Sequence, residues 1–171
     1  MGVPLLIISG SMGSGKTTVL GEASDLLAEA GIAHAAIDLD HLGNMHPPQG
    51  QYGDALMFAN LAAVWPIYAA AGAERLLVAR VVEEQSALER YREAIPGAAP
   101  VVCLLTAPTE VMQERIRERE PGMFQQQYLA RSAELADILA NAGAEDYSVD
   151  NGTGRPIGVV AREVLSRAGW L

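Results

Sequence analysis

The residues best suited to chemistry lie in a glycine-rich segment near the N-terminus, Gly10 to Thr17, with the sequence GSMGSGKT. Glycine, lysine and threonine occur there at the spacing G-x-x-x-x-G-K-[ST], after the apolar run 5–8 and before a helical pattern. Glycines let several backbone N–H groups converge on one anion, and the start of the helix adds partial positive charge. A glycine-rich turn that matches by chance is the alternative, but the flanking strand and helix favour a phosphate-binding loop.

The side chains of this loop suit a nucleotide. Lys16 is long enough to reach the β- and γ-phosphates, and the hydroxyl of Thr17 can ligate Mg²⁺. We therefore expect a nucleoside triphosphate and Mg²⁺ to be bound through Gly10, Ser11, Gly13, Ser14, Gly15, Lys16, Thr17 and Thr18.

Two aspartates, Asp38 and Asp40, end the second apolar run of the chain. Residues two apart in a strand point the same way, so both carboxylates should project at the carboxyl end of a parallel sheet, beside the phosphate-binding loop. One could take the proton of a phosphoryl acceptor, and the other could hold Mg²⁺ through water. A solvated turn is the alternative, because aspartate is common in turns.

The same stretch partly matches two other motifs. It begins like a calcium-binding loop but has Leu42 and Gln49 where that motif needs ligands. The run from Asp40 to Gly43 fits the D-x-x-G pattern of GTPases, yet the sequence has no Asn-Lys-x-Asp run for guanine. His41 and His46 have no evident third metal ligand, so we expect them in a loop, with His41 near the substrate.

Strand and helix patterns alternate along the whole chain. Apolar runs predict strands over residues 5–8, 33–39, 75–82, 101–105 and 146–150, and helical spacing predicts helices over 19–30, 54–71, 83–94, 108–119, 125–142 and 156–168. This alternation predicts an α/β fold with a five-stranded parallel sheet flanked by helices on both faces. The sequence has no linker rich enough to separate domains, so we expect one domain over residues 1–171.

The composition excludes several classes of protein and favours a cytoplasmic one. The 171 residues are 50% apolar, which suffices for a core, and a single cysteine excludes an intrachain disulfide. The chain has 12 Lys and Arg against 21 Asp and Glu, and its net charge of −9 disfavours nucleic acid and requires that an anion be held locally. The apolar stretch 61–73 contains Pro66 and is too short to cross a membrane, and no basic residue precedes Lys16, so no signal peptide is expected.

With its phosphate-binding loop and the run Ile37-Asp38-Leu39-Asp40, the chain resembles the small P-loop kinases of metabolites: adenylyl-sulfate kinase, shikimate kinase, gluconate kinase and chloramphenicol phosphotransferase. The order of elements is similar over nearly the whole chain and implies a three-layer P-loop NTPase fold. The resemblance to shikimate kinases gives Asp38 a water-mediated contact with Mg²⁺ and Asp40 the acceptor hydroxyl. The resemblance to chloramphenicol phosphotransferase makes Asp38 the base instead. Asn60 lies where adenylyl-sulfate kinases carry an asparagine, which implies a substrate contact.

The resemblance also implies roles for arginines in the second half of the chain. Arg115 corresponds to the arginine that packs on adenine, and Arg119 or Arg117 to the arginine of a mobile lid, here residues 119–128. A guanidinium can stack on a base and donate two hydrogen bonds to phosphate oxygens. Ordinary surface pairs with glutamates of the same helix are the alternative. Loop 150–154 is expected to lie behind the adenine.

Arg80 falls inside the expected third strand, where a buried charge is costly unless it is paired. It either binds an anionic group of the acceptor or forms an ion pair with Asp38 or Asp40. The similar kinases often keep an acid or a glycine-rich turn at the end of this strand, where Glu83 is the candidate acid here. The D-G-D-N run of adenylyl-sulfate kinases is not intact, so that substrate is not implied.

Together these residues predict a kinase that moves the γ-phosphoryl group of ATP to a hydroxyl of a small molecule with the help of Mg²⁺. The expected catalytic residues are Lys16, Asp38, Asp40 and Arg119, the substrate contacts are Asp40, His41, Asn60 and Arg80, the metal ligands are Thr17 and Asp38, and Arg115 completes the ATP site. A regulatory NTPase and a nucleotide-binding module without catalysis are the alternatives. Loop 43–53 and the helix after it should select the acceptor, which stays open among sugars, nucleosides, sulfate esters and antibiotics. We expect a monomer or a homodimer.

Overall fold

A computed structural model describes residues 2–47 and 54–171, and in this part of the chain five parallel strands form one sheet. The strands are β1 (Val3–Ser9), β2 (Ala35–Asp38), β3 (Leu76–Ala79), β4 (Ala98–Thr106) and β5 (Tyr147–Asp150). Their order across the sheet is β2-β3-β1-β4-β5, and every neighbouring pair is parallel. The predicted five-stranded parallel sheet is confirmed, with β1 at its centre.

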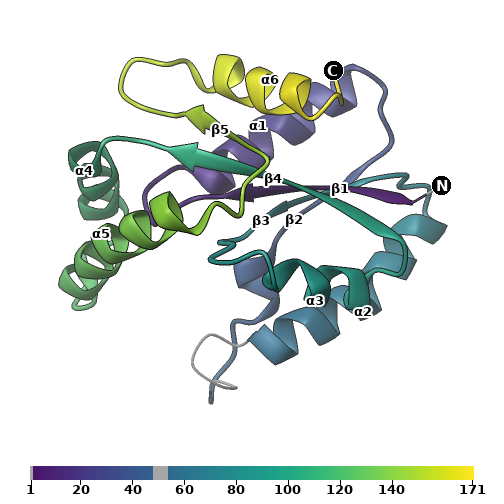
Figure 1. Ribbon diagram of the computed structural model, residues 1–171, viewed down its shortest axis with the longest axis horizontal. Coiled ribbons are helices and arrows are strands. Elements are labelled where there is room, and N and C mark those ends of the chain that lie inside the picture. The colour runs from purple at the N-terminus through teal and green to yellow at the C-terminus, as the bar shows by residue number, and fades with distance from the viewer. Residues whose placement is uncertain (1, 48–53) are drawn as a thin grey trace.

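Helices cover both faces of this sheet (Figure 1). The helices of the described residues are α1 (Lys16–Glu29), α2 (Asp54–Ala70), α3 (Ala87–Ala94), α4 (Thr109–Arg119), α5 (Gln125–Ala142), α6 (Ile157–Arg167) and the short 3-10 helix η1 (Leu39–Leu42). On one face α1 packs beside α6, and on the other α2 packs beside α3. The pair α4 and α5 lies near the end of the sheet toward which β4 points. This is the three-layer α/β architecture that the alternation predicts.

The central strand β1 is apolar at successive positions because helices cover both of its faces. Leu5 and Ile7 belong to the core under α2 and α3, whereas Leu6 and Ile8 belong to the core under α1 and α6. Successive side chains of a strand point to opposite faces, so a strand covered on both sides needs apolar residues throughout. The phosphate-binding loop therefore starts from a central strand that is buried from Leu5 to Ser9.

The third strand is shorter than predicted. It ends at Ala79, and not at residue 82, and Ala79 pairs with the last residue of β2, Asp38. Arg80 consequently follows the strand and does not interrupt it. The next helix begins at Ala87 and not at residue 83, so Glu83 lies in the connecting segment.

The end of the second strand also differs from the prediction. Residues Leu39–Leu42 form η1, so Asp40 lies in a helical turn and not in a strand. The side chain of Asp38 accepts a hydrogen bond from the backbone N–H of Asp40, which caps this turn and ends the strand. Strand alternation therefore does not set the direction of the Asp40 side chain, because the strand ends at Asp38.

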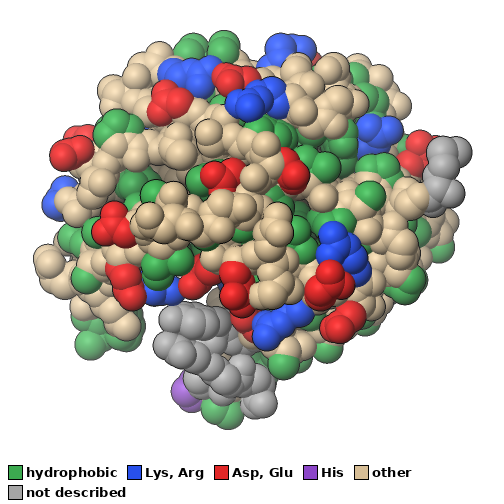
Figure 2. Space-filling view, viewed as in Figure 1, with side chains coloured by type: hydrophobic (Ala, Val, Ile, Leu, Met, Phe, Trp, Pro, Cys, Tyr) green, Lys and Arg blue, Asp and Glu red, His purple; other side chains and the backbone are tan. Residues whose placement is uncertain are grey.

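Charged side chains are spread over the surface. Figure 2 shows acidic and basic side chains scattered over the face in view, with no continuous basic stripe across that face. None of the helices in the described part of the chain is both long and apolar enough to span a membrane.

Two buried tyrosines allow a matched test of what a buried hydroxyl contributes. The hydroxyl of Tyr147 donates to the carbonyl of Val164 at 2.7 Å, whereas that of Tyr91 has no hydrogen-bond partner in residues 2–47 and 54–171. We expect Tyr147→Phe to lower the free energy of unfolding by about 1 kcal/mol, because a buried hydrogen bond is lost. Tyr91→Phe should leave it unchanged or raise it. Urea unfolding measures both values, and an equal loss in the two variants would contradict the prediction.

Candidate functional site

At two of its glycines, the loop between β1 and α1 passes so close to neighbouring atoms that a Cβ atom would not fit. Gly13 has a φ of +80° and Gly15 a φ of +95°, in the left-handed region that favours glycine. A Cβ atom on Gly13 would lie 2.3 Å from the carbonyl oxygen of Met112 in α4, and one on Gly15 would lie 2.4 Å from Nδ2 of Asn151. The glycines of the motif are thus required by the packing of α4 and of the segment after β5 against the loop.

Two buried polar side chains brace this loop from distant parts of the chain. Nδ2 of Asn151 donates to the carbonyl of Ser14 at 2.7 Å. The hydroxyl of Ser11 donates a hydrogen bond to the backbone carbonyl of Ser132 in α5 at 2.6 Å. The hydroxyl of Ser132 in turn donates to the backbone carbonyl of Met12 at 2.8 Å. The sequence analysis missed this role of Asn151 and missed Ser132 altogether. The signal for Ser132 is a lone polar residue on an otherwise apolar helix face.

Lys16 lies where the loop meets α1, with its ammonium group folded over the loop. Its Nζ atom donates to the carbonyl oxygens of Gly10 at 2.9 Å and Ser11 at 3.1 Å. Burial lowers the pKa of Lys16 to about 8, although the nearby carboxylates of Asp40 and Asp38 act in the opposite direction. The side chain is therefore a buried cation at neutral pH.

The loop offers polar groups that fit a phosphate. The hydroxyl of Ser14 is buried and has no hydrogen-bond partner in the part of the chain that the structure describes. It lies in the same short loop as the Lys16 ammonium group and the N-terminus of α1. A buried donor without a partner is costly, and an anion bound here would accept hydrogen bonds from these groups.

The predicted metal ligands Thr17 and Asp38 are brought together. Oγ1 of Thr17 donates to Oδ2 of Asp38 at 2.6 Å. Within the described residues no group of three or more His, Cys, Asp or Glu side chains is arranged to hold a metal ion. Mg²⁺ commonly uses one or two protein oxygens and takes its remaining ligands from water and phosphate, so a hydroxyl and a carboxylate beside the loop fit this ion.

Asp40 is held at the site by an ion pair with Arg80, and not by the alternation of side chains along a strand. Arg80 donates from Nη1 to Oδ1 of Asp40 and from Nη2 to Oδ1 of Asp54 at 2.6 Å, and Arg90 donates to the other oxygen of Asp54 at 3.2 Å. Burial disfavours the charge of Arg80, but Asp40 and Asp54 overcome this and raise its pKa above the ordinary value. Of the two interpretations of Arg80, the ion pair with Asp40 is the one that the structure contains. The part played by Asp54 was missed.

The arginines of α4 differ in their surroundings. Arg115 lies against the phosphate-binding loop, where it donates to the carbonyls of Asn151 at 2.9 Å and Gly13 at 3.3 Å. Arg119 is paired with Glu120 at the surface, although its charge is close enough to act on the pKa of Lys16. The exposed guanidinium of Arg117 donates to the side-chain oxygen of Gln113 at 3.3 Å, and the carbonyl of Arg117 accepts a hydrogen bond from Gln125. Arg115 thus lies where a contact with a bound nucleotide is feasible.

The predicted lid, residues 119–128, begins at the last residue of α4. Residues 120–124 connect α4 to α5, and residues 125–128 form the first turn of α5. Met123 is 88% exposed and Phe124 is 55% exposed, while Gln125 donates to the carbonyl of Glu120 at 2.9 Å. Whether this segment closes over a ligand stays a prediction.

Other predicted residues lie outside the cavity beside Lys16. Thr18 and His41 are exposed, and Nδ2 of Asn60 donates to the carbonyl of Leu42 at 2.7 Å, which fastens η1 to α2. Neither His41 nor Asn60 is among the described residues that line this cavity. Residues 48–53 of the predicted acceptor loop, including Gln49, lie outside the described residues.

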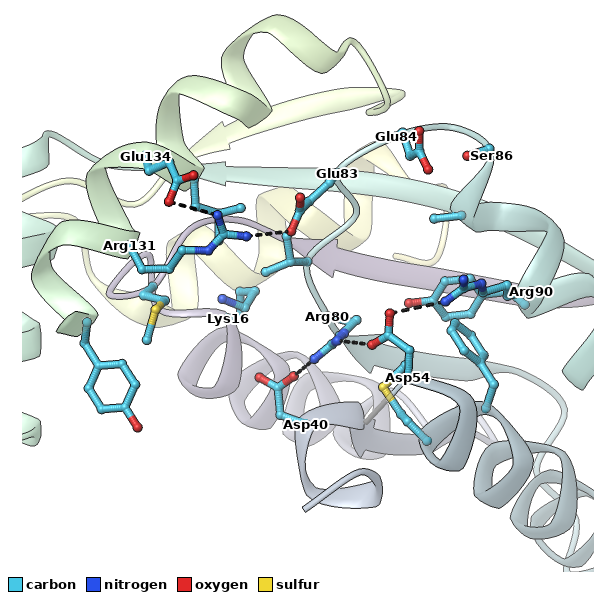
Figure 3. A pocket seen from close by; sticks show the side chains of 18 of the residues that line it. Lys16, Asp40, Asp54, Arg80, Glu83, Glu84, Ser86, Arg90, Arg131 and Glu134 are labelled. Carbon is cyan, nitrogen blue, oxygen red and sulfur yellow. Dashed lines mark hydrogen bonds and ion pairs between the residues drawn. The ribbon is translucent and has the colours of Figure 1, made fainter. Parts of the chain in front are cut away.

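A cavity of about 940 Å³ opens beside Lys16. Figure 3 shows Asp40, Arg80 and Asp54 on one side of it and Arg131 with Glu134 on the other. Apolar and aromatic side chains complete the lining: Met12, Met57, Phe58, Val81, Ala87, Tyr91, Tyr128, Ala130 and Leu135. Pockets of this size hold small organic ligands.

Comparison with solved structures identifies the fold. A gluconokinase from Sinorhizobium meliloti 1021 has a TM-score of 0.62 at 20% identity, with 97% of this chain and 91% of that chain covered. A tunicamycin resistance protein of Deinococcus radiodurans has a TM-score of 0.69 at 16% identity, with coverage of 99% and 97%. A shikimate kinase from Acinetobacter baumannii in complex with shikimate has a TM-score of 0.56 at 18% identity, with coverage of 96% and 92%.

The chain has the fold of P-loop small-molecule kinases. The three-layer P-loop fold implied by the sequence resemblance is thereby confirmed. No protein-family model and no curated protein matches the sequence.

Lys16 is the only lysine of the chain, which makes its ionisation directly measurable. We expect Lys16 to titrate near pH 8 and not near 10.5, because burial disfavours the charged form. After reductive ¹³C-methylation, NMR should show one lysine resonance that shifts with a midpoint near 8, and urea-unfolded protein is the control at the ordinary value. A midpoint near 10 in the folded protein would contradict the burial of this amine.

Proposed function

We propose that this protein is a kinase that transfers the γ-phosphoryl group of ATP to a hydroxyl group of a small molecule, with Mg²⁺ held beside Thr17 and Asp38. The observation that carries the proposal is that Lys16 of the phosphate-binding loop and Asp40 line the same cavity. A nucleotide on the loop would present its terminal phosphate to a space that can hold a second substrate. Holding both reactants in one cavity supplies much of the rate enhancement in phosphoryl transfer.

In the proposed reaction the acceptor oxygen bonds to the γ-phosphorus, the bond from that phosphorus to the β–γ bridging oxygen breaks, and ADP leaves. Asp40 takes the proton of the acceptor hydroxyl, while Lys16 and the loop N–H groups stabilise charge on the phosphates. Thr17 and Asp38 hold Mg²⁺, which when bound offsets the charge of the β- and γ-phosphate oxygens.

The assignment of Asp40 as the base rests on how the two aspartates are engaged. The carboxylate of Asp38 accepts hydrogen bonds from Thr17 on one oxygen and from the N–H of Asp40 on the other. Asp40 has one oxygen held by Arg80, and its side chain is 55% exposed at the cavity. Asp40 is therefore better placed to meet an incoming hydroxyl, and Asp38 to hold the metal ion.

Further parts of the proposal rest on the sequence and on the fold neighbours. Arg115 would contact the nucleotide, and the segment 119–128 would close over it with Arg119 near the transferring phosphate, which would exclude water. ATP is preferred to GTP in this proposal because the sequence lacks an Asn-Lys-x-Asp run. The names of a gluconokinase and a shikimate kinase among the fold neighbours support a hydroxylated small molecule as the acceptor. A supply of ATP suits a cytoplasmic location.

Nucleotide binding is tested by titration calorimetry with ATP and with GTP, each with Mg²⁺. We expect ATP to bind in the micromolar range and Lys16→Ala to weaken it by about 100-fold, because one buried cation and its phosphate contacts are lost. The control is Arg162→Ala, which removes an exposed cation on α6. Affinity should also fall as the pH rises through about 8, since Lys16 then loses its proton. Failure of both nucleotides to bind would contradict the proposal.

Catalysis is tested by Asp40→Asn. We expect kcat for phosphorylation of hydroxylated metabolites to fall by about 100-fold, while the Kd for ATP changes by less than about twofold. Asp25→Asn, on the exposed side of α1, is the matched control. Unchanged transfer in Asp40→Asn would move the role of base to Asp38. A wild-type protein that binds ATP and phosphorylates none of a broad set of hydroxylated metabolites would favour a regulatory NTPase or a binding module.

A further inference from the structure

The cavity beside Lys16 has a charge pattern that bears on its second substrate. At about 940 Å³ it lies at the upper end of the range for small-molecule sites. Its described lining carries four basic side chains, Lys16, Arg80, Arg90 and Arg131, and five acidic ones, Asp40, Asp54, Glu83, Glu84 and Glu134. Lys16 belongs to the phosphate site, so the remainder of the lining has an excess of negative charge.

Each arginine of the cavity is already bound to carboxylates. Arg80 contacts Asp40 and Asp54, and Arg90 also contacts Asp54. On the opposite wall Arg131 donates to Glu83 at 3.1 Å and to Glu134 at 3.0 Å (Figure 3). An acceptor carboxylate that bound one of these arginines would lie beside the carboxylates already paired with it, so like-charge repulsion would oppose its binding.

The carboxylates themselves have free capacity for donors. An ionised carboxylate can accept about four hydrogen bonds, and the side chains of Glu134 and Glu83 remain 63% and 44% exposed. Hydroxyl and ammonium groups donate hydrogen bonds, and a carboxylate does not. Ser86, Gln127 and Tyr128 add neutral polar groups to the same lining.

The apolar part of the lining independently favours an uncharged ligand. Phe58 and Tyr91 meet edge to face, with ring centroids 5.0 Å apart and an interplanar angle of 89°, and Met57 lies beside them in the lining. The hydroxyl of Tyr91 is buried without a hydrogen-bond partner in the described part of the chain. Burial raises the pKa of this hydroxyl, so it adds no negative charge to the lining. A sugar ring or another hydroxylated carbon skeleton would pack on the apolar surface of the other side chains.

We propose that the acceptor of this site is a polyhydroxylated molecule that is uncharged or carries an amino group, and that the carboxylate-bound arginines make the site discriminate against sugar acids. The inference rests on the proposed kinase function and narrows its substrate class. It also separates this cavity from what the names of the gluconokinase and shikimate kinase neighbours would suggest.

The test compares acceptors that share one carbon skeleton and differ in charge. Lactobionate, lactitol and 1-amino-1-deoxylactitol form one series, and gluconate, glucitol and glucamine form a smaller one. With the full chain, ATP and Mg²⁺, ADP formation should give a kcat/KM for the alcohol or the amine at least about tenfold above that of the acid. A preference for lactobionate or gluconate would overturn the inference and leave the kinase proposal standing.

Binding measurements distinguish failure of the inference from failure of the proposed function. The same six compounds are titrated into protein saturated with ADP and Mg²⁺, where no phosphoryl transfer can occur. Tighter binding of the alcohol or the amine without phosphorylation in the presence of ATP would uphold the charge preference and count against the kinase. Tighter binding of the acids would overturn the charge preference, whatever the catalytic result.

A charge variant tests the cause of the preference. Glu134→Gln removes one carboxylate from Arg131, so the ratio of lactobionate to lactitol binding should rise by about threefold to tenfold. Glu89→Gln is the matched control, because Glu89 pairs with Arg92 on α3 at the same three-residue spacing and is not among the described lining residues. An equal ratio in wild type and Glu134→Gln, or an equal rise in both variants, would contradict the assignment.

Discussion

Every other feature of the site depends on how the protein holds the buried ammonium group of Lys16. A charge taken out of water is costly unless other groups oppose it. Two loop carbonyls fix its position, and the carboxylates of Asp40 and Asp38 partly offset the desolvation that lowers its pKa. The N-terminus of α1 adds positive potential at the same place. An anion on the loop is therefore the occupant that relieves the cost of this arrangement.

The carboxylates near Lys16 are kept from neutralising it by partners of their own. Asp38 is bound by the hydroxyl of Thr17, and Asp40 is bound by Arg80. Arg80 leaves the end of β3 and reaches both η1 and the first turn of α2, so its planar fork joins three elements at the carboxyl end of the sheet. This explains why a charged residue follows a buried strand, and it leaves the Lys16 ammonium available to a ligand.

The phosphate-binding loop and the order of strands and helices could be predicted from the sequence, because local rules determine both. Glycine is required where neighbouring atoms leave no room for a Cβ atom on the loop. Continuous apolar runs are required where helices cover both faces of a strand. The position of Asp40 could not be predicted from the pattern of apolar residues. The backbone N–H of Asp40 donates a hydrogen bond to the side chain of Asp38, and this bond caps η1 where the pattern predicts the end of a strand. The bracing of the loop by Ser132 and Asn151 joins segments more than 100 residues apart, and no spacing rule connects them.

The acidity of the whole chain bears on which form of nucleotide reaches the loop. A net charge of −9 repels a free triphosphate at long range and attracts divalent cations. Binding of Mg²⁺ would reduce the negative charge of the nucleotide and so weaken that repulsion, and the carboxylate of Asp38 is hydrogen-bonded to Thr17 in the first turn of α1. In the proposed function, the long-range field and the local ligands would thus favour the same species, the magnesium complex of the nucleotide. Local donors then supply the affinity that the overall charge opposes, which is how an acidic protein can bind a polyanion.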